Sequence, residues 1–355
     1  MKQKPSIIKV LLVDDSITAL EYLTYIINTD GKLKVVAKAR DGEEAIKLVQ
    51  ETDPDVVVMD IQMPKMDGYA ATRKIMETHP VPIVIVSGSL RTKDVTNSFR
   101  AMEAGAVAAL KKPEGPDHPD FERITAKFVQ TVKLMSEVRV VRRIAKFQKS
   151  KAPDGLPSKV ENGGLAALIE IVAIGVSTGG PPVIRTLLSN LTNDFRVPIL
   201  IVQHIAPGFL QGMAEWLDHE TPLSVQISKN GDRVRRGGVY FAPESYHMGI
   251  TGEREIFFSS AAPENGVKPS VSYLFRSVTK AFGQRAVGVL LTGMGKDGVL
   301  ELKEMKDKGA ITIAQDKESS VVHGMPGEAI KIGAANHVLS PEEIAAFLSS
   351  MLNQK

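Results

Sequence analysis

Apolar runs alternate with amphipathic stretches along the first third of the chain. Strand-like runs rich in apolar residues predict strands at residues 7–13, 33–39, 56–59, 83–86 and 106–110. The stretches between them, with apolar residues at threes and fours, predict helices at 19–28, 43–51, 69–77 and 94–104. Strands that alternate with helices indicate βαβ units, so we expect a doubly wound, five-stranded parallel sheet with helices on both faces.

A helical stretch and then a segment without periodicity separate this part from the rest. Apolar residues recur at threes and fours from Phe121 to Val138, which predicts one more helix. Residues 149–164 lose this spacing and gather proline, glycine and serine, the composition of a linker. We therefore expect a first domain over 1–125, a helical extension and linker over 126–166, and a second domain over 167–355.

The second half returns to alternating strands and helices. Apolar runs predict strands at 168–174, 199–203, 238–242, 286–292 and 311–314. Amphipathic spacing predicts helices at 182–190, 210–219, 271–282, 300–308 and 342–352. We expect a second α/β domain, doubly wound around a mostly parallel sheet, with an antiparallel excursion around 224–258.

Composition narrows the class of protein. Hydrophobic residues make up 43% and charged residues 24% of the 355 residues, an ordinary globular balance. Cysteine is absent, which excludes disulfides, a cysteine nucleophile and a cysteine-ligated zinc site. A net charge of +3 gives no sign of nucleic-acid binding. No apolar run reaches the about 18 residues of a membrane span, so we expect no membrane insertion and a cytoplasmic location.

Acidic residues follow two strands of the first predicted sheet. Asp14 and Asp15 come after the first strand and Asp60 after the third, at the edge where parallel strands end together. Carboxylates this close need a cation, and hard oxygen ligands suit Mg²⁺. Ser87 after the fourth strand and Lys112 after the fifth complete a predicted phosphoryl-transfer site. One such aspartate alone is usually a turn or capping residue, but five positions at strand ends are seldom accidental.

The same positions resemble the receiver domain of two-component response regulators over roughly residues 5–125. The motifs are Val-Asp-Asp-Ser at 13–16, Met-Asp-Ile-Gln-Met-Pro-Lys-Met-Asp-Gly at 59–68, Val-Ser-Gly-Ser at 86–89 and Lys-Lys-Pro at 111–113. The resemblance implies that a histidine kinase phosphorylates Asp60. It implies that Mg²⁺ is held by Asp14, Asp15, Asp60 and the Gln62 carbonyl. It also implies that Ser87 and Lys112 contact the phosphoryl group. Ala109 stands where many receivers carry an aromatic residue.

A Gly-x-Ser-x-Gly pattern at 175–179 follows the first strand of the second half. Such a strand-to-helix turn is typical of a serine nucleophile, here Ser177. The prolines at 181 and 182 favour a helix start, whose free N–H groups would stabilise an oxyanion or a phosphate. A phosphate-binding glycine-rich loop therefore remains an alternative, whereas a P-loop is excluded because no Gly-Lys-Ser/Thr follows.

A serine nucleophile needs a base and a carboxylate that orients it. His204 ends the strand predicted beside that of Ser177, which favours it over the other candidate bases, His247 and His323. Asp297 follows the strand at 286–292 and is the candidate carboxylate, although it could equally cap the next helix. Asp316 is the competing carboxylate. The resulting order of serine, histidine and aspartate differs from that of the α/β-hydrolases.

A second resemblance covers this half of the chain. Its motifs are Ile-Gly-Val-Ser-Thr-Gly-Gly-Pro at 174–181, Val-Gln-His at 202–204, Tyr-Phe-Ala-Pro at 240–243 with His247, Lys-Pro-Ser-Val at 268–271, Leu-Thr-Gly-Met-Gly-Lys-Asp-Gly at 291–298, Thr-Ile-Ala-Gln-Asp at 312–316 and Gly-Met-Pro at 324–326. They look like the chemotaxis protein-glutamate methylesterases, in which a receiver precedes such a domain.

The second resemblance implies an activity and a role for each site residue. It implies hydrolysis of glutamyl methyl esters on the cytoplasmic domains of chemoreceptors, and deamidation of receptor glutamines, with no cofactor in the catalytic domain. Ser177 matches the nucleophile, His204 the base and Asp297 its partner. Thr178 and the backbone N–H of Met294 match groups that line the acyl and oxyanion site. The unphosphorylated receiver is expected to cover the catalytic edge until Asp60 is phosphorylated.

The chain departs from this family's usual motifs at positions that do not include the three catalytic candidates: Ile205, Ala206, Ser272 and Gly327. Two other classes of function remain. One is a receiver-controlled binding module whose serine is not catalytic, and the other is a transcription regulator. No helix-turn-helix pattern follows the linker, which disfavours the regulator.

Overall fold

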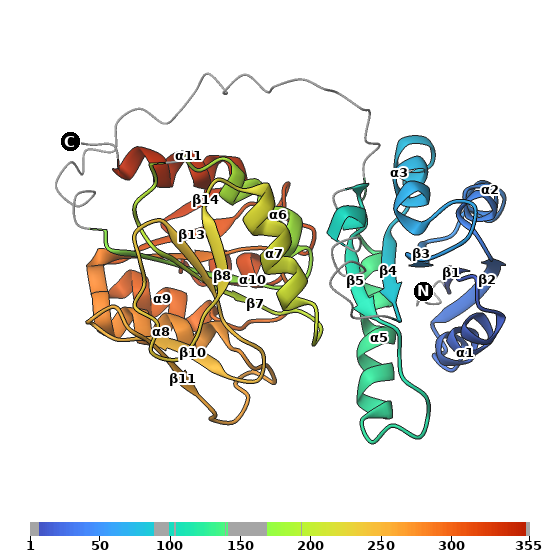
Figure 1. Ribbon diagram of the computed structural model, residues 1–355, viewed down its shortest axis with the longest axis horizontal. Helices are drawn as coiled ribbons and strands as arrows, with labels where there is room; N and C mark the ends of the chain where they lie inside the picture. Colours follow the sequence, from blue (N-terminus) through green and yellow to red (C-terminus); the bar gives the residue numbers. More distant parts are fainter. Residues whose placement is uncertain are drawn as a thin grey trace, which may run out of the picture. The chain divides into compact units, whose positions relative to one another are not determined.

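The computed structural model describes residues 7–88, 99–102, 104–138, 140, 169–192 and 194–352. The chain divides into two compact units, Met1–Phe147 and Gln148–Lys355, called unit 1 and unit 2 below (Figure 1). Most of the predicted linker lies outside the described residues, so the domain limits at 125 and 166 stay predictions.

Unit 1 is built on five parallel strands in the order β2-β1-β3-β4-β5. Buried valine, leucine and isoleucine fill the central strands, as expected for a sheet covered on both faces. The strands are β1 (Ile8–Val13), β2 (Leu33–Ala39), β3 (Val56–Asp60), β4 (Ile83–Ser87) and β5 (Ala108–Lys111). The predicted doubly wound parallel class is confirmed, and the strand order reverses between β1 and β3.

The helices of unit 1 lie on both faces of its sheet. They are α1 (Ile17–Asn28), α2 (Gly42–Thr52), α3 (Gly68–Thr78) and α5 (Phe121–Ser136). α1 and α5 contact each other on one face, while α2 and α3 contact each other on the other (Figure 1). Ser16, Asp41 and Asp67 cap the first three by accepting a hydrogen bond from a backbone N–H in the first turn. The helix predicted at 94–104 falls mostly outside the described residues.

Unit 2 contains a larger parallel sheet of seven strands in the order β14-β13-β12-β6-β7-β9-β8. β6 is the central strand. The next strands along the chain, from β7 to β9, lie on one side of it, and β12 to β14 lie on the other, so the strand order reverses at β6. The strands are β6 (Ile171–Val176), β7 (Ile199–Gln203), β8 (Ser224–Ile227), β9 (Gly238–Phe241), β12 (Ala286–Leu290), β13 (Ile311–Gln315) and β14 (His337–Leu339). The predicted parallel α/β class is confirmed here too.

Two helical layers cover the sheet of unit 2. α8 (Val271–Phe282), α9 (Val299–Asp307) and α10 (Met325–Lys331) pack on one face, and α6 (Gly180–Ser189), α7 (Leu210–Glu220) and α11 (Pro341–Leu352) form the other layer (Figure 1). A short 3₁₀ turn, Gly283–Arg285, leads from α8 into β12. Helix α10 and strand β14 were not predicted, because seven and three residues are too few to show a period.

The antiparallel excursion predicted around 224–258 is only partly correct. β8 pairs with β9 and β9 with β7 in parallel, so both strands extend the main sheet. The antiparallel part is the pair β10 (His247–Ile250) and β11 (Ile256–Ser259), a separate two-stranded sheet, with an isolated antiparallel bridge between Arg233 and Glu255. Strand direction depends on pairing between distant segments, which local periodicity does not encode.

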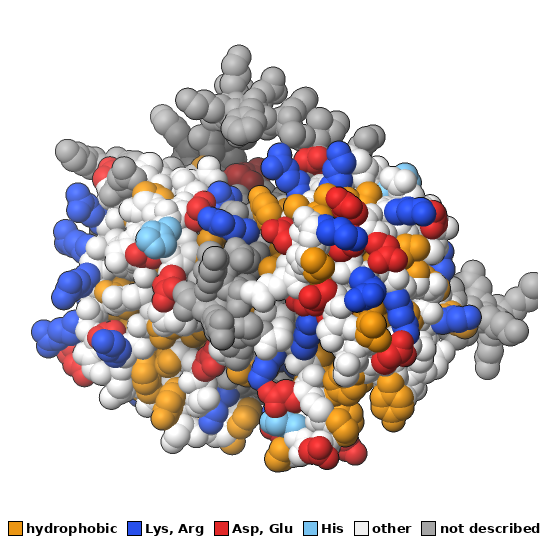
Figure 2. Space-filling model, turned by 45° about the vertical axis from the view of Figure 1, so that its right-hand side comes forward, with side chains coloured by type: hydrophobic (Ala, Val, Ile, Leu, Met, Phe, Trp, Pro, Cys, Tyr) orange, Lys and Arg blue, Asp and Glu red, His pale blue; other side chains and the backbone are white. Residues whose placement is uncertain are grey.

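Charged side chains of both signs are interspersed on the one face of the molecule that Figure 2 draws. On the face drawn in Figure 2, Lys and Arg side chains lie among Asp and Glu side chains, in keeping with the small net charge of +3. Among the helices that the structure describes, none has the length and apolar character needed to cross a membrane.

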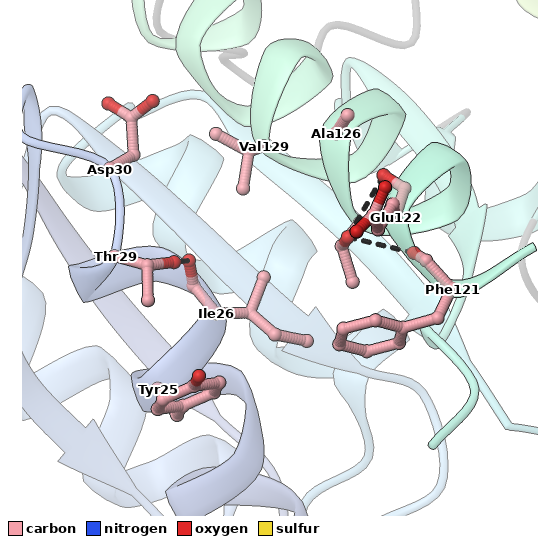
Figure 3. Close-up of a pocket in the computed structure, with 9 residues that line it drawn as sticks. Tyr25, Ile26, Thr29, Asp30, Phe121, Glu122, Ala126 and Val129 are labelled. Atoms are coloured by element: carbon pink, nitrogen blue, oxygen red, sulfur yellow. Dashed lines mark hydrogen bonds between the residues drawn. The ribbon is translucent and has the colours of Figure 1, made fainter. Parts of the chain in front are cut away.

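A hollow in unit 1 lies between α1 and α5 (Figure 3). In the close-up, Ile26 of α1 and Phe121 of α5 face each other across it, and Asp30 at its margin forms an ion pair with Lys133. The residues that line it include none of the predicted phosphorylation-site residues.

Candidate functional sites

The first candidate site is an acidic cluster where the strand order of unit 1 reverses. Asp14 and Asp15 follow β1 directly, and Asp60 is the last residue of β3, the neighbouring strand. One carboxylate oxygen from each lies within 4.8 Å of the others. Asp14 and Asp60 are buried while Asp15 is exposed. The fold therefore brings together the three carboxylates that the sequence placed at strand ends.

Lys112 supplies the positive charge of this cluster. Its Nζ lies 2.6 Å from Asp14 Oδ2 and 2.7 Å from Asp60 Oδ2. Burial raises the pKa of Asp60 above its usual value. The nearby Asp14 raises this pKa further, whereas Lys112 lowers it, and the net shift is upward. One lysine leaves the three carboxylates with excess negative charge, and a hard oxygen donor set of this kind fits Mg²⁺. The three carboxylates could therefore hold a metal ion.

The other predicted receiver residues lie around the cluster. Ser87 is buried at the end of β4, next to β3, and Lys112 donates its backbone N–H to the Ser87 carbonyl at 2.9 Å. Gln62 lies two residues beyond Asp60 in the loop before α3. Ala109 is half-buried on β5. The loop is held close to β3, since a Cβ on Gly68 would lie 2.1 Å from the Asp60 carbonyl oxygen.

The second candidate site begins at Ser177, directly after the central strand β6. Ser177 is half-buried, its N–H donates to the Thr292 carbonyl at 3.0 Å, and its own carbonyl accepts the Gly180 N–H. The helix α6 starts at Gly180, with Gly179 in the left-handed region at φ 77°. A side chain at Gly179 would also meet Val321 at 2.4 Å. The tight turn that the motif predicts is thus present, with a helix N-terminus next to the serine.

His204 follows β7, the strand beside β6. Its backbone N–H donates to the Val176 carbonyl at 2.9 Å, which fixes the residue next to the Ser177 turn. Its Nε2 lies 3.0 Å from Asp297 Oδ2. Nε2 is buried and forms no hydrogen bond within the described residues, and such contacts are often poorly aligned before substrate binds. The buried Gln203 adds a link that the sequence did not predict, since its Nε2 donates to the carbonyls of Ser177 and His204.

Asp297 is buried, and its carboxylate lies at the N-terminus of α8. Oδ2 accepts the Val271 N–H at 2.6 Å, and Oδ1 accepts Ser270 Oγ–H at 2.8 Å, Asn265 Nδ2–H at 3.0 Å and the Ser272 N–H at 3.2 Å. Burial would raise the pKa of Asp297, but His204 and these donors together hold it well below its usual range. Asp297 does not cap α9, whose N-cap residue is Gly298.

Thr178 follows Ser177 in the chain, and Met294 follows Gly293, which lies against the serine. The Thr178 carbonyl accepts a hydrogen bond from Thr292 Oγ1 at 2.9 Å. Gly293, next to Met294, is so close that a Cβ there would lie 2.6 Å from the Cβ of Ser177. Met294 is 41% exposed. The backbone around Met294 is thus adjacent to the serine, where the sequence predicted the oxyanion donors.

The competing candidates have other partners. The buried His247 uses both ring nitrogens, accepting the Ser270 N–H at Nδ1 and donating from Nε2 to the Ala262 carbonyl. The Nδ1 atom of His323 lies 3.3 Å from Ser320 Oγ. Asp316 accepts hydrogen bonds from the N–H and Oγ of Ser319. Within the described residues, the carboxylate that pairs with His204 is that of Asp297.

The four departures from the family's motifs all lie near this site. Ile205 and Ala206 are half-buried and follow His204. Ser272 lies in the first turn of α8, where it accepts the Gly298 N–H and donates to Glu301. Gly327 is buried at the start of α10, and a Cβ there would lie 2.9 Å from His323 Cδ2.

The chain thus combines a receiver-like parallel α/β unit that contains an acidic cluster with a second parallel α/β unit in which a histidine–aspartate pair lies next to the Ser177 turn. Comparison with known proteins agrees for both units. The response regulator receiver domain pattern matches residues 10–120, and the CheB methylesterase pattern matches residues 172–348. The chain belongs to the CheB methylesterase family.

Relatives and a solved structure support this assignment. The chain is 52% identical to a protein-glutamate methylesterase/protein-glutamine glutaminase of Geobacter metallireducens, over 98% of this chain and 100% of the relative. It is 49% identical to one of Nitrosospira multiformis, over 98% of each. This chain is also similar to the crystal structure of the catalytic domain of Thermotoga maritima CheB methylesterase, with 36% sequence identity and a TM-score of 0.50. The match covers 52% of this chain and 98% of the Thermotoga chain.

Proposed function

We propose that this protein is a protein-glutamate methylesterase and protein-glutamine glutaminase of chemotaxis, whose activity rises when Asp60 is phosphorylated. Full-length relatives carry these activities in their names. The observation that carries the proposal is the pairing of His204 with Asp297 next to the Ser177 turn, on one chain with the Asp60 cluster. The substrates would be glutamyl methyl esters and glutamines on the cytoplasmic domains of chemoreceptors, which would place the enzyme in the cytoplasm.

The proposed chemistry is acyl transfer through Ser177. Asp297 favours the His204 tautomer with its proton on Nε2, which leaves the Nδ1 lone pair to take the Ser177 proton. The serine oxygen attacks the carbonyl carbon, and backbone N–H groups near Met294 stabilise the oxyanion. The His204 proton then passes to the leaving methoxide, which departs as methanol, or to the leaving amide nitrogen, which departs as ammonia. Water cleaves the acyl-serine and restores the enzyme.

The proposed control site uses the Asp60 cluster. A histidine kinase would donate a phosphoryl group to Asp60, with Lys112 and Ser87 in contact with its oxygens. Mg²⁺ held by Asp14, Asp15, Asp60 and the Gln62 carbonyl would neutralise charge on those oxygens. Lys112 already bridges Asp14 and Asp60, so added charge on Asp60 would change what the lysine binds.

The test is methanol release from membranes that contain methylated chemoreceptors, with and without Mg²⁺ and acetyl phosphate. We expect release by the wild-type protein to rise with the phosphodonor, Asp60→Asn to remain at the basal rate, and Ser177→Ala to release none. A serine-directed fluorophosphonate should label Ser177 in the wild-type protein. A folded protein that neither releases methanol nor reacts with the fluorophosphonate would instead support the binding-module alternative.

A further inference from the structure

The carboxylate of Asp297 is held by the N-terminus of α8, and this N-terminus is itself held by a buried histidine. Ser270 is the N-cap residue of α8 and is fully buried. Its Oγ donates to Asp297 Oδ1 at 2.8 Å, and its backbone N–H donates to Nδ1 of His247 at 3.2 Å. Ser270 therefore joins His247 to Asp297 through two separate hydrogen bonds.

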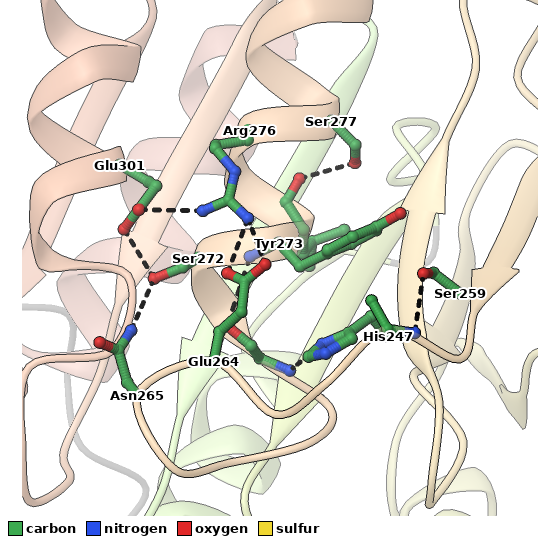
Figure 4. A network of polar contacts seen from close by, with 12 residues as sticks. His247, Ser259, Glu264, Asn265, Ser272, Tyr273, Arg276, Ser277 and Glu301 are labelled. Atoms are coloured by element: carbon green, nitrogen blue, oxygen red, sulfur yellow. Dashed lines mark hydrogen bonds and ion pairs between the residues drawn. The ribbon is translucent and has the colours of Figure 1, made fainter.

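His247 is fixed in one tautomer by its surroundings. A backbone N–H can only donate, so Nδ1, which accepts from Ser270, carries no proton. A carbonyl oxygen can only accept, so Nε2, 3.0 Å from the Ala262 oxygen, carries the proton. The ring also stacks on Tyr273 of α8, with centroids 4.9 Å apart (Figure 4). The imidazole is fully buried, so its neighbours determine where it lies.

The contacts form a path from a core strand to the proposed base. β10, which carries His247, packs on α8. The path then runs from His247 through Ser270 to Asp297 Oδ1, and from Asp297 Oδ2 to His204 Nε2. Asn265 also donates to Asp297 Oδ1. Asn265 donates to Ser272 as well, and Ser272 donates to Glu301 (Figure 4). Asp297 Oδ1 thus has two side-chain donors, and the donor at the helix N-cap, Ser270, is the one that contacts His247.

We propose that His247 is a positioning residue for the Ser177 reaction, acting through Ser270 on Asp297 and so on His204. This inference rests on the proposed function, because it assumes that Ser177, His204 and Asp297 act together. It assigns the essential role to Nδ1 as a hydrogen-bond acceptor for Ser270. The Nε2 contact with the Ala262 carbonyl serves the packing of the ring and is not part of the path to Asp297.

Two substitutions separate these nitrogens. In His247→Asn the amide oxygen replaces Nδ1 and can still accept from Ser270. In His247→Gln the amide nitrogen replaces Nε2 and can still donate to the Ala262 carbonyl, while the acceptor next to Ser270 is lost. Both remove the stacking on Tyr273. Asn also removes more volume than Gln, so a role in packing alone predicts that Asn is the more damaging change.

The measurement is the rate of fluorophosphonate labelling of Ser177 in the full chain, with thermal unfolding of each variant. We expect His247→Gln to label about tenfold or more slowly than the wild type, as a displaced catalytic group would. We expect His247→Asn to stay close to the wild-type rate even though it is the less stable variant. With methylated receptor as substrate, the Gln variant should lower kcat and leave KM nearly unchanged.

The possible failures are distinguishable. An unlabelled wild-type protein overturns the proposed function and this inference with it. A labelled wild type with the Gln variant as fast as the Asn variant, or faster, overturns the inference alone. If neither His247 variant folds, Ser270→Ala and Ser270→Thr decide, since only Thr keeps a hydroxyl for Asp297. Labelling of Ser270→Ala at the wild-type rate then overturns the inference, and slow labelling restored in Ser270→Thr supports it.

Discussion

A single amide group joins the two residues at the centre of the proposed reaction. Gln203 Nε2 donates to the carbonyls of Ser177 and His204, each at 2.8 Å. Turning the amide over would place Oε1 against both carbonyl oxygens, so the contacts determine its orientation. Within the described part of the chain, Oε1 has no hydrogen-bond partner, an arrangement that costs about 1–3 kcal/mol. A costly buried amide is retained where it fixes the backbone of both the nucleophile and the base.

Gln203→Met tests this link, since methionine is similar in length and cannot donate a hydrogen bond. We expect Ser177 labelling by a fluorophosphonate to slow by about ten- to a hundredfold, because the serine and histidine backbones lose their common donor. Unfolding midpoints should change little, since the unpaired Oε1 is removed as well. Gln211→Met on the exposed surface of α7 is the matched control. Wild-type labelling in Gln203→Met would show that the backbone alone fixes the site.

The sequence singled out candidate catalytic residues, but it did not single out the side chains that contact them. Ser177, His204 and Asp297 lie at strand ends and in recognisable motifs, and the fold brings His204 and Asp297 together. Gln203 and His247 were not predicted as supports because Ser177 and Ser270, which they contact, lie in other segments of the chain. For Asp297, local sequence suggested a cap on α9, whereas its carboxylate lies at the start of α8. A side chain that precedes one helix in the sequence can thus bind the N-terminus of a different helix in the fold.

At the scale of elements, the acidic cluster depends on how closely α3 follows β3. Gly68, the first residue of α3, packs against the backbone of Asp60 and Ile61. The Gly68 N–H also donates to the Ile61 carbonyl at 2.9 Å. The loop between β3 and α3 is therefore tied to β3 at both ends. Since this loop contains Gln62, its path also determines where that carbonyl lies relative to Asp60.

Gly68→Ala should disturb the cluster without touching any of its side chains. The new Cβ would lie 2.1 Å from the Asp60 carbonyl oxygen, so either β3 or α3 must shift. Overpacking of this kind costs about 1–3 kcal/mol in unfolding free energy, and we expect Mg²⁺ binding measured by calorimetry to weaken as well. The matched control is Gly31→Ala, where nothing lies within 4 Å of the added carbon. Equal stability and Mg²⁺ affinity in both variants would contradict this account.

Element type was predicted more reliably than element pairing. Strands β2 and β7 and helix α8 begin and end at the predicted residues, because each has a clear period and a clear stop. The direction of β8 and β9 was predicted wrongly, because both follow α7 in a segment whose short strands resemble a hairpin series. The parallel pairing of β9 with β7, and of β8 with β9, depends on the crossover connections of the whole sheet, which no local window contains.

At the scale of the whole molecule, each unit has its own core and its own site. The three candidate Mg²⁺ carboxylates all belong to unit 1. The protein's one tryptophan, Trp216, is buried in α7 of unit 2. Its fluorescence therefore reports on unit 2 alone, whereas far-ultraviolet circular dichroism reports on both. The two signals can separate the stability of the unit that receives the phosphoryl group from that of the unit proposed to act on the ester.

We expect Mg²⁺ to raise the urea midpoint of one phase of the circular dichroism signal and leave the Trp216 midpoint unchanged. A ligand that binds only the folded state stabilises it by about 2.7 kcal/mol at a hundred times its Kd. Asp15→Asn is the control, because Asp15 is the exposed member of the cluster and its loss should remove the Mg²⁺ shift with little other effect. A Trp216 midpoint that rises together with the circular dichroism phase would mean that both units unfold as one. Control of Ser177 by Asp60 would then pass through a single cooperative structure rather than through contacts between two independently stable units.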